Sequence, residues 1–296
     1  MKKVTIFIFT VALIIFMVLP LYAQETQSMK DGFRLYYGRD FSGAKEHFQS
    51  VLDKEPSNSM AIMYLADCYR QDKTIAKLLD AFEEKALANP KDPYIKCHLG
   101  FAYFCQSMMT RDDLFEEAIN QFQEALKLDT DNALGYTGMG TIYYQKRLIP
   151  RAKSYFTKAI KLNSKDTMAL ERLGDIYLND DKNYMPARNA FEEIISLYPS
   201  YPDAYFYYAS ASQAIKEFDT AIEYFNKTSA MDPLGITLGY YAPVRIGDIY
   251  FKELKNYEKA LESYNSALKI NPENSYAKSM VEKSKNPPKE DSKGAK

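Results

Sequence analysis

The chain has 296 residues, of which 46% are hydrophobic and only 12 are glycine, a composition that suits one long stack of helices. Its 38 basic and 39 acidic residues give a formal net charge of −1 and are interleaved along the chain. No basic stretch is present that could follow a phosphate backbone, so nucleic acid is excluded as an expected partner.

The first 23 residues have the layout of a secretory signal peptide. Two lysines precede an apolar run over residues 4–19, and Pro20 and Ala23 stand before a polar segment that begins at Gln24. Cleavage after Ala23 would export a chain beginning at Gln24, which would be periplasmic or secreted. An uncleaved segment would instead anchor the chain in the inner membrane, facing the periplasm, and this is the one membrane contact expected.

The rest of the chain repeats one pattern. A small residue, an aromatic ring, a second small residue and a helix stop follow one another at offsets of four, three and five, as in Ala152, Phe156, Ala159 and Ser164. The stops lie about 34 residues apart, a period that indicates a solenoid. The rings of the seven copies are Phe48, Phe82, Phe122, Phe156, Phe191, Phe225 and Tyr264.

A second helix precedes each of these sets and carries a recurring glycine. Gly140, Gly174 and Gly247 stand at equivalent positions of three copies. Glycine within a helix costs about 1 kcal/mol relative to alanine, so its recurrence requires a physical reason. The missing Cβ predicts a close approach of the paired helix, whose small residue meets the glycine while its ring reaches towards the next copy.

These residues resemble the tetratricopeptide repeat family, whose helix-turn-helix unit carries this order of aromatic, Leu-Gly, Tyr, Ala, aromatic, Ala and Pro. The resemblance implies an all-α fold, a right-handed superhelix of about seven repeats closed by a capping helix. The expected repeats are 25–58, 59–92 (degenerate), 93–132 (with an insertion in its turn), 133–166, 167–201, 202–235 and 240–274.

In this family the first helix of each repeat lines a concave groove, and the residues carried over to those positions are mostly aromatic. An aromatic groove suits a peptide or an amphipathic helix, because such rings offer a large contact area at low entropic cost. The expected partner-binding residues are Phe33, Tyr36, Tyr37, Tyr94, Phe101, Phe104, Tyr144, Phe206, Tyr241 and Phe251.

No catalytic, metal-binding or cofactor-binding motif is found, so the chain is not expected to be an enzyme or to hold a cofactor. His47 and His98 lack further ligands at metal-site spacing. Cys97 and Cys105 lie about 12 Å apart along one expected helix and cannot form a disulfide with each other. Cys68 could pair with either, or all three thiols could be free and packed between helices.

Two insertions and the C-terminus complete the chain. Met108 and Met109 are expected on a loop within the third repeat, and residues 235–240 lengthen the connection before the seventh repeat. Residues 275–285 have one apolar face and predict a capping helix, and residues 286–296 are too polar to fold and predict a disordered tail.

These observations together predict an exported, non-catalytic scaffold of a bacterial cell envelope that binds other proteins. The bacterial origin is inferred from composition, which prefers Lys to Arg and includes 25 Tyr. An alternative from another functional class is a carrier of a small apolar ligand, accessory to a solute transporter, with the ligand held among the aromatic side chains.

Overall fold

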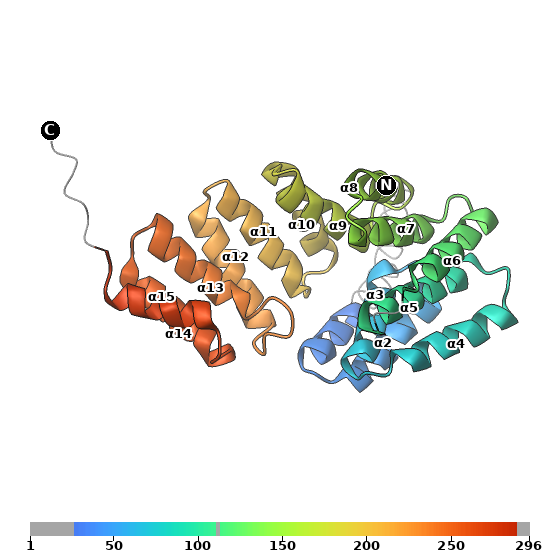
Figure 1. Cartoon of the computed structure of the whole chain (residues 1–296), viewed down its shortest axis with the longest axis horizontal. Helices are drawn as coiled ribbons and strands as arrows, with labels where there is room; N and C mark the ends of the chain where they lie inside the picture. Colours follow the sequence, from blue (N-terminus) through green and yellow to red (C-terminus); the bar gives the residue numbers. More distant parts are fainter. Residues whose placement is uncertain (1–26, 111–112, 289–296) are drawn as a thin grey trace, which may run out of the picture. The chain divides into compact units, whose positions relative to one another are not determined.

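The computed structural model describes residues 27–110 and 113–288, and all regular structure in these ranges is helical (Figure 1). The all-α prediction is therefore confirmed. A helix over residues 27–37 comes first. It is followed by α2 (Phe41–Lys54), α3 (Ser59–Gln71), α4 (Ile75–Ala88), α5 (Pro93–Thr110), α6 (Phe115–Leu128), α7 (Ala133–Gln145), α8 (Ile149–Leu162), α9 (Thr167–Asp175), η1 (Ile176–Asp180), α10 (Tyr184–Leu197), α11 (Pro202–Ala214), α12 (Phe218–Met231), α13 (Tyr241–Asp248), η2 (Ile249–Glu253), α14 (Tyr257–Ile270) and α15 (Ser275–Lys285).

The predicted signal peptide, residues 1–23, and most of the predicted tail lie outside the described residues. Within the described ranges, none of the helices combines the length and the hydropathy needed to cross a bilayer.

Asparagine side chains begin several of the helices that follow a repeat boundary. Asn58, Asn132 and Asn274 each accept a hydrogen bond through Oδ1 from a backbone amide three residues later, at 3.0, 2.9 and 2.9 Å. Such a cap satisfies one of the four amide groups that a helix leaves unpaired at its start. The boundaries of the paired helices are therefore fixed locally, by short polar side chains.

The recurring glycines face the aromatic rings. A Cβ added to Gly140 would lie 2.6 Å from Cε1 of Phe156, so the two paired helices approach as closely as they do only without it. Phe122 is held in the same way by Gly100 of its own repeat and by Gly138 of the next repeat. The glycine thus contacts the aromatic ring itself, and not the small residue of the second helix as the sequence predicts. The prediction that the ring reaches towards the next repeat is confirmed for Phe122.

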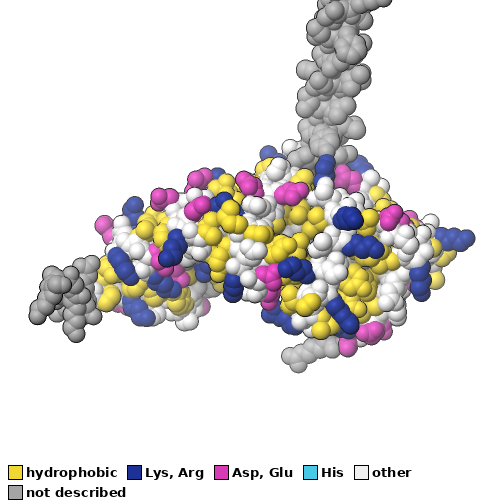
Figure 2. Space-filling model, turned by 90° about the horizontal axis from the view of Figure 1, so that it is seen from above, with side chains coloured by type: hydrophobic (Ala, Val, Ile, Leu, Met, Phe, Trp, Pro, Cys, Tyr) yellow, Lys and Arg dark blue, Asp and Glu magenta, His cyan; other side chains and the backbone are white. Residues whose placement is uncertain are grey.

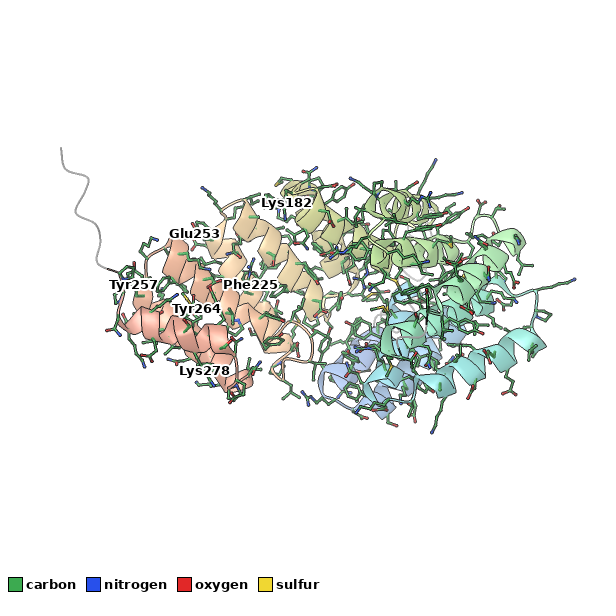
Figure 3. The ribbon with its side chains drawn as sticks, viewed as in Figure 1. Lys182, Phe225, Glu253, Tyr257, Tyr264 and Lys278 are labelled. Atoms are coloured by element: carbon green, nitrogen blue, oxygen red, sulfur yellow. The ribbon has the colours of Figure 1, made fainter. Side chains whose placement is uncertain are left out.

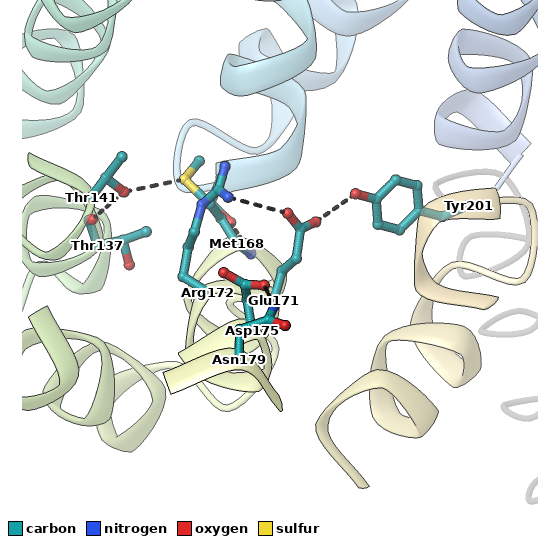
Figure 4. Close-up of polar contacts among 9 residues, drawn as sticks. Thr137, Thr141, Met168, Glu171, Arg172, Asp175, Asn179 and Tyr201 are labelled. Atoms are coloured by element: carbon teal, nitrogen blue, oxygen red, sulfur yellow. Dashed lines mark hydrogen bonds and ion pairs between the residues drawn. The ribbon is translucent and has the colours of Figure 1, made fainter. Parts of the chain in front are cut away.

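The chain divides into two compact units, residues 1–169 (unit 1) and residues 170–296 (unit 2), and each is described by itself. In unit 1, parts of the chain far apart in sequence meet at the inner side of the first helices. The amide of Met168 donates to Oγ of Ser59 at 3.3 Å, across 109 residues. Thr137 donates to the buried Asp166 carboxylate at 2.5 Å. Thr141 donates to Sδ of Met168 (Figure 4). Unit 1 is thus a tightly coiled set of repeats.

The insertion of the third repeat lies largely within a helix. Helix α5 continues through Met108 and Met109 to Thr110, so the two methionines stand on a helix that is longer than the other first helices. The expectation that they lie on a loop is wrong, because apolar residues such as Phe104 and Cys105 continue the buried face of α5 and support its last turns.

Two π-helical turns, η1 and η2, end the first helices of the fifth and seventh repeats. In both repeats the glycine and the small residue of the second helix are 13 residues apart, from Gly174 to Ala187 and from Gly247 to Ala260. The corresponding interval in the fourth repeat, from Gly140, is 12 residues. A π turn holds one residue more than an α turn, so η1 and η2 take up the additional residue where it occurs.

Unit 2 ends in the predicted capping helix. Ala277, Met280 and Val281 of α15 pack in one cluster with Ala260, Tyr264 and Ala267 of α14. Figure 3 shows Tyr264 pointing from α14 into this part of the unit, and Phe225 lies among the helices of the preceding repeat. Helix α15 thus covers an apolar face that the next repeat of a longer array would cover.

Candidate functional site: a pocket in unit 2

A pocket of about 480 Å³, which we call the unit 2 pocket, lies between three successive repeats. Its walls come from η1 and the turn after it, from the start of α10, from α11, from the connection between α12 and α13, and from α13 itself. It is lined by Leu178, Asn179, Lys182, Tyr184, Phe206, Tyr207, Ser210, Ala214, Leu238, Tyr241 and Arg245.

Helix α11 supplies the two central rings of the unit 2 pocket. Phe206 packs edge-on against Phe225, with ring centroids 5.2 Å apart, and Tyr207 stacks on Phe191 at 5.0 Å. Burial raises the pKa of Tyr207, so its hydroxyl stays protonated at neutral pH and can donate a hydrogen bond. Because both rings are supported from behind, this wall is formed before any ligand binds.

The η1 turn supplies the opposite wall. The Asn179 side chain donates to Asp175 at 2.5 Å, which fixes it against the preceding helical turn (Figure 4). Lys182 follows η1 with a backbone φ of +54°, a conformation that few residues other than glycine adopt. Figure 3 shows Lys182 at the end of this turn, and the residue is exposed.

A buried carboxylate organises the connection between α12 and α13. Asp232, which has no exposed surface, accepts hydrogen bonds from the amides of Ile236, Thr237 and Gly239 at 2.8, 3.0 and 2.9 Å. A Cβ on Gly239 would lie 2.0 Å from the backbone oxygen of Asp232. The insertion at residues 235–240 is therefore a folded lip, and it places Leu238 at the unit 2 pocket.

Arg245 reaches the unit 2 pocket from α13. Its Nε is buried, and no acceptor among the described residues takes the hydrogen bond that this nitrogen can donate. A buried donor without an acceptor costs free energy, so a site that contains one gains by receiving an acceptor from outside.

Within residues 27–110 and 113–288, no three His, Cys, Asp or Glu side chains are arranged to hold a metal ion. The three cysteines are free and buried, and burial raises the pKa of Cys68 and Cys105 to about 12, so the thiols stay protonated. His98 is buried and hydrogen-bonded through Nε2 to the carbonyl of Pro56 at 2.8 Å.

The sequence matches three family models. One described as tetratricopeptide repeat matches residues 34–93 and 180–235, another with the same description matches residues 134–166 and 244–274, and one described as TPR repeat matches residues 115–146. Together these segments cover more than half of the chain. The chain belongs to the tetratricopeptide repeat family.

Curated relatives of this tetratricopeptide repeat protein include longer chains. A TPR repeat-containing protein of Methanocaldococcus jannaschii is 23% identical over 262 residues, which are 83% of this chain and 44% of the relative. Protein O-mannosyl-transferase TMTC1 of Mus musculus is 26% identical over 126 residues, 43% of this chain and 13% of that protein. The chain thus spans less than half the length of these curated relatives.

Solved structures show the same fold. YrrB, described as a TPR protein with an unusual peptide-binding site, superposes with a TM-score of 0.54 at 22% identity, over 69% of this chain and 99% of that one. The hetero-tetramer of Cut9 and Hcn1 from the APC/C gives a TM-score of 0.62 at 17% identity, over 85% of this chain and 48% of the matched chain.

Five of the predicted groove residues are in the core of unit 1. Phe33 and Tyr36 pack against Tyr64 of the neighbouring repeat, at centroid distances of 5.0 and 4.8 Å. Phe101 packs against Phe122 of its own repeat at 5.0 Å. A partner cannot reach side chains that neighbouring rings already cover, so for them the groove assignment is corrected. The five are Phe33, Tyr36, Tyr37, Phe101 and Phe104.

The remaining predicted groove residues are at least partly accessible. Tyr94 and Tyr144 are half-buried in unit 1, and Phe251 is half-buried against Tyr257 in unit 2. Phe206 and Tyr241 line the unit 2 pocket, where Tyr241 is 43% exposed. The structure therefore brings two of the ten predicted residues together in one site.

Sequence reasoning missed the polar half of the unit 2 pocket. Arg245 and Lys182 belong to different repeats, and nothing local in the sequence shows that they face one space. Leu238 depends on the lip that Asp232 holds, which is also a tertiary feature. The 13-residue interval after Gly174 is a signal for the wall that η1 supplies, because an additional residue in a repeat of fixed length must alter the local helix.

Proposed function

We propose that this chain is an exported, non-catalytic scaffold that binds partner proteins through the unit 2 pocket. Tetratricopeptide repeat proteins generally mediate protein–protein interactions. The observation that carries the proposal for this chain is the unit 2 pocket, an open space with rigid aromatic walls and two rings, Phe206 and Tyr241, at family groove positions.

A peptide or a helix of a partner suits this space. The site is concave, its apolar walls are formed in advance, and it has a few polar groups that can fix orientation, which is how most binding sites are built. YrrB, which shares the fold, is described as having a peptide-binding site, and this supports a peptide as the ligand here.

The proposed location rests on residues 1–23, whose lysines, apolar run and Ala23 are typical of a secretory signal. N-terminal sequencing of the protein from a native host should give Gln24 as the first residue. An intact Met1 in a membrane fraction would favour the anchored form instead.

The proposal excludes catalysis and nucleic acid. The matched segment is a small part of the O-mannosyl-transferase, and the described residues include no group of His, Cys, Asp or Glu arranged to hold a metal ion. Basic and acidic side chains are mixed on the face shown in Figure 2, which does not suit a phosphate backbone. A small apolar ligand is not favoured either, because Lys182 and Arg245 line the pocket.

Site-specific crosslinking in cells tests the proposed function. A photoreactive amino acid at Tyr241 should form a covalent adduct with one or a few proteins. The matched control places it at Leu87, which is 83% exposed on unit 1 and distant in sequence from the pocket. If position 241 gave no adduct, or the same adducts as position 87, the proposal would be rejected.

A further inference from the structure

We propose that the unit 2 pocket binds an acidic side chain, aspartate or glutamate, within an internal segment of the partner protein. The inference rests on the proposed function and adds the chemical class of the segment that is bound. It is carried by the charge of the lining residues, by their lack of partners and by the apolar surface beside them.

The charged groups that line the unit 2 pocket are both cations. Lys182 comes from the turn after η1 and Arg245 from α13, so two repeats each direct one positive charge to the same space, and no acid lines it. Among the described residues, neither side chain has an ion-pair or hydrogen-bond partner, and Nε of Arg245 is buried. A carboxylate would supply the acceptor that Arg245 lacks, through a charge-assisted hydrogen bond.

Three acids of the helices around the pocket are occupied by other donors. Glu171 accepts from the hydroxyl of Tyr201 at 2.5 Å, and Asp175 accepts from Asn179 (Figure 4). Asp203 accepts from the hydroxyl of Thr237 in the lip. These contacts hold the carboxylates in the framework around the pocket, so the attraction of the two lining cations is available to a ligand.

The apolar surface predicts what stands beside the acid. Phe206, Tyr207 and Leu238 present two rings and one aliphatic side chain to the same space, and these suit an aromatic or aliphatic neighbour of the acidic residue. Tyr241 and Lys182 are exposed at the edge of the pocket, which leaves it open to a chain that continues in both directions. An internal segment fits such an opening.

Peptide selection tests this inference. The probe is a random peptide library displayed on phage with its C-terminus fused to the coat protein, so that every selected acid is a side chain. The full chain should enrich peptides in which Asp or Glu adjoins an aromatic or aliphatic residue. Changing that acid to its amide in a synthetic copy with blocked ends should weaken binding by about tenfold or more.

Variants of the protein identify the cations. Arg245→Gln should remove most of the preference for acid over amide, and Arg245→Lys should restore part of it because the charge is kept. Lys182→Asn should reduce the preference while retaining a residue that tolerates positive φ. The matched control is Lys216→Asn, because Lys216 has the same backbone conformation in the next repeat and does not line the pocket.

The possible outcomes separate the two proposals. Peptides that bind the pocket without an acid, or that bind Arg245→Gln and Arg245→Lys equally well, would overturn the inference and leave the proposed function intact. Selection only from a library with free C-termini would also overturn it, since the terminal carboxylate would then be the ligand. If no peptide distinguished the wild type from a variant with a filled pocket, both proposals would fail.

Discussion

The two units use the same repeat but differ at the inner side of their first helices. In unit 1 the residue after the packing glycine is a phenylalanine in two repeats, Phe33 and Phe101, and both rings are fully covered. In unit 2 the equivalent residue of the sixth repeat is Ser210, and it lines the unit 2 pocket. The side chain at this repeat position is thus one of the differences between the filled interior of unit 1 and the unit 2 pocket.

The difference shows that membership of the family does not locate its binding surface. The same backbone positions carry core residues where rings of neighbouring first helices meet, and site residues where a small side chain leaves room between them. The following predictions test this contrast between the units, beginning with the largest expected effect.

Exchanging the two residue types should have opposite results. Phe101→Ser in unit 1 should lower the free energy of unfolding by about 3 to 5 kcal/mol, because it removes a buried ring and buries a hydroxyl. Ser210→Phe in unit 2 should change it by less than about 1 kcal/mol, because the pocket provides room, and should abolish partner binding. Urea denaturation and crosslinking from position 241 measure the two effects. Equal destabilisation by both changes would contradict the contrast.

Acid should loosen unit 1 before unit 2. Burial lowers the pKa of His98 from 6.5 to about 4, so the unfolded chain binds this proton more readily than the folded chain does. The stabilisation is complete above about pH 6.5 and is lost as the pH falls towards 4, by on the order of 2 to 3 kcal/mol.

Hydrogen exchange resolved by unit measures this loss. Both histidines of the chain, His47 and His98, are in unit 1, so unit 2 supplies an internal reference. The His98→Gln variant has no ionisable group at this position. Its loss of stability between pH 6.5 and 4 should therefore be smaller than that of the wild type by the amount attributed to His98. The same loss in the variant and the wild type would exclude His98 as its source.

Gly239→Ala should damage the lip of the unit 2 pocket. The new Cβ would overlap the backbone oxygen of Asp232, which cannot move away as a flexible side chain could. We expect a loss of about 2 kcal/mol in stability together with weaker partner binding. Gly43→Ala in unit 1 is the control, because its nearest neighbour is the Asp40 side chain and its effect should stay within about 0.5 kcal/mol. Normal binding by Gly239→Ala would show that the lip is dispensable.

The smallest expected effect is the same in both units. Lys73 of unit 1 and Lys216 of unit 2 have φ of +57° and +65° in their repeat turns. Glycine in place of either should raise the free energy of unfolding by about 0.5 kcal/mol. Glycine relieves the backbone strain of the positive φ, and this gain is partly offset because glycine also increases the conformational entropy of the unfolded chain. Thermal unfolding measures both changes, and a clear loss of stability in either would show that the lysine side chain contributes contacts of its own.

The sequence was sufficient to predict the repeats, the helix pairing and the capping helix, because each depends on residues within one 34-residue period. The groove was predicted less well. Tyr36 packs against Tyr64 of the next repeat and is therefore closed to a partner protein. This contact depends on the distance between neighbouring first helices, and no single repeat encodes that distance. The unit 2 pocket also requires a lip folded around Asp232 and cations from two repeats, which are features of the assembled unit.

The π turns have a consequence for how such arrays change over time. Because η1 absorbs its additional residue within a single helical turn, the glycine and ring contacts on either side keep their partners. A three-nucleotide insertion in a gene of this kind can therefore reshape one wall of a cavity while every later module stays in phase. Tandem architectures can in this way acquire new recognition surfaces one amino acid at a time, without rebuilding the modules that surround them.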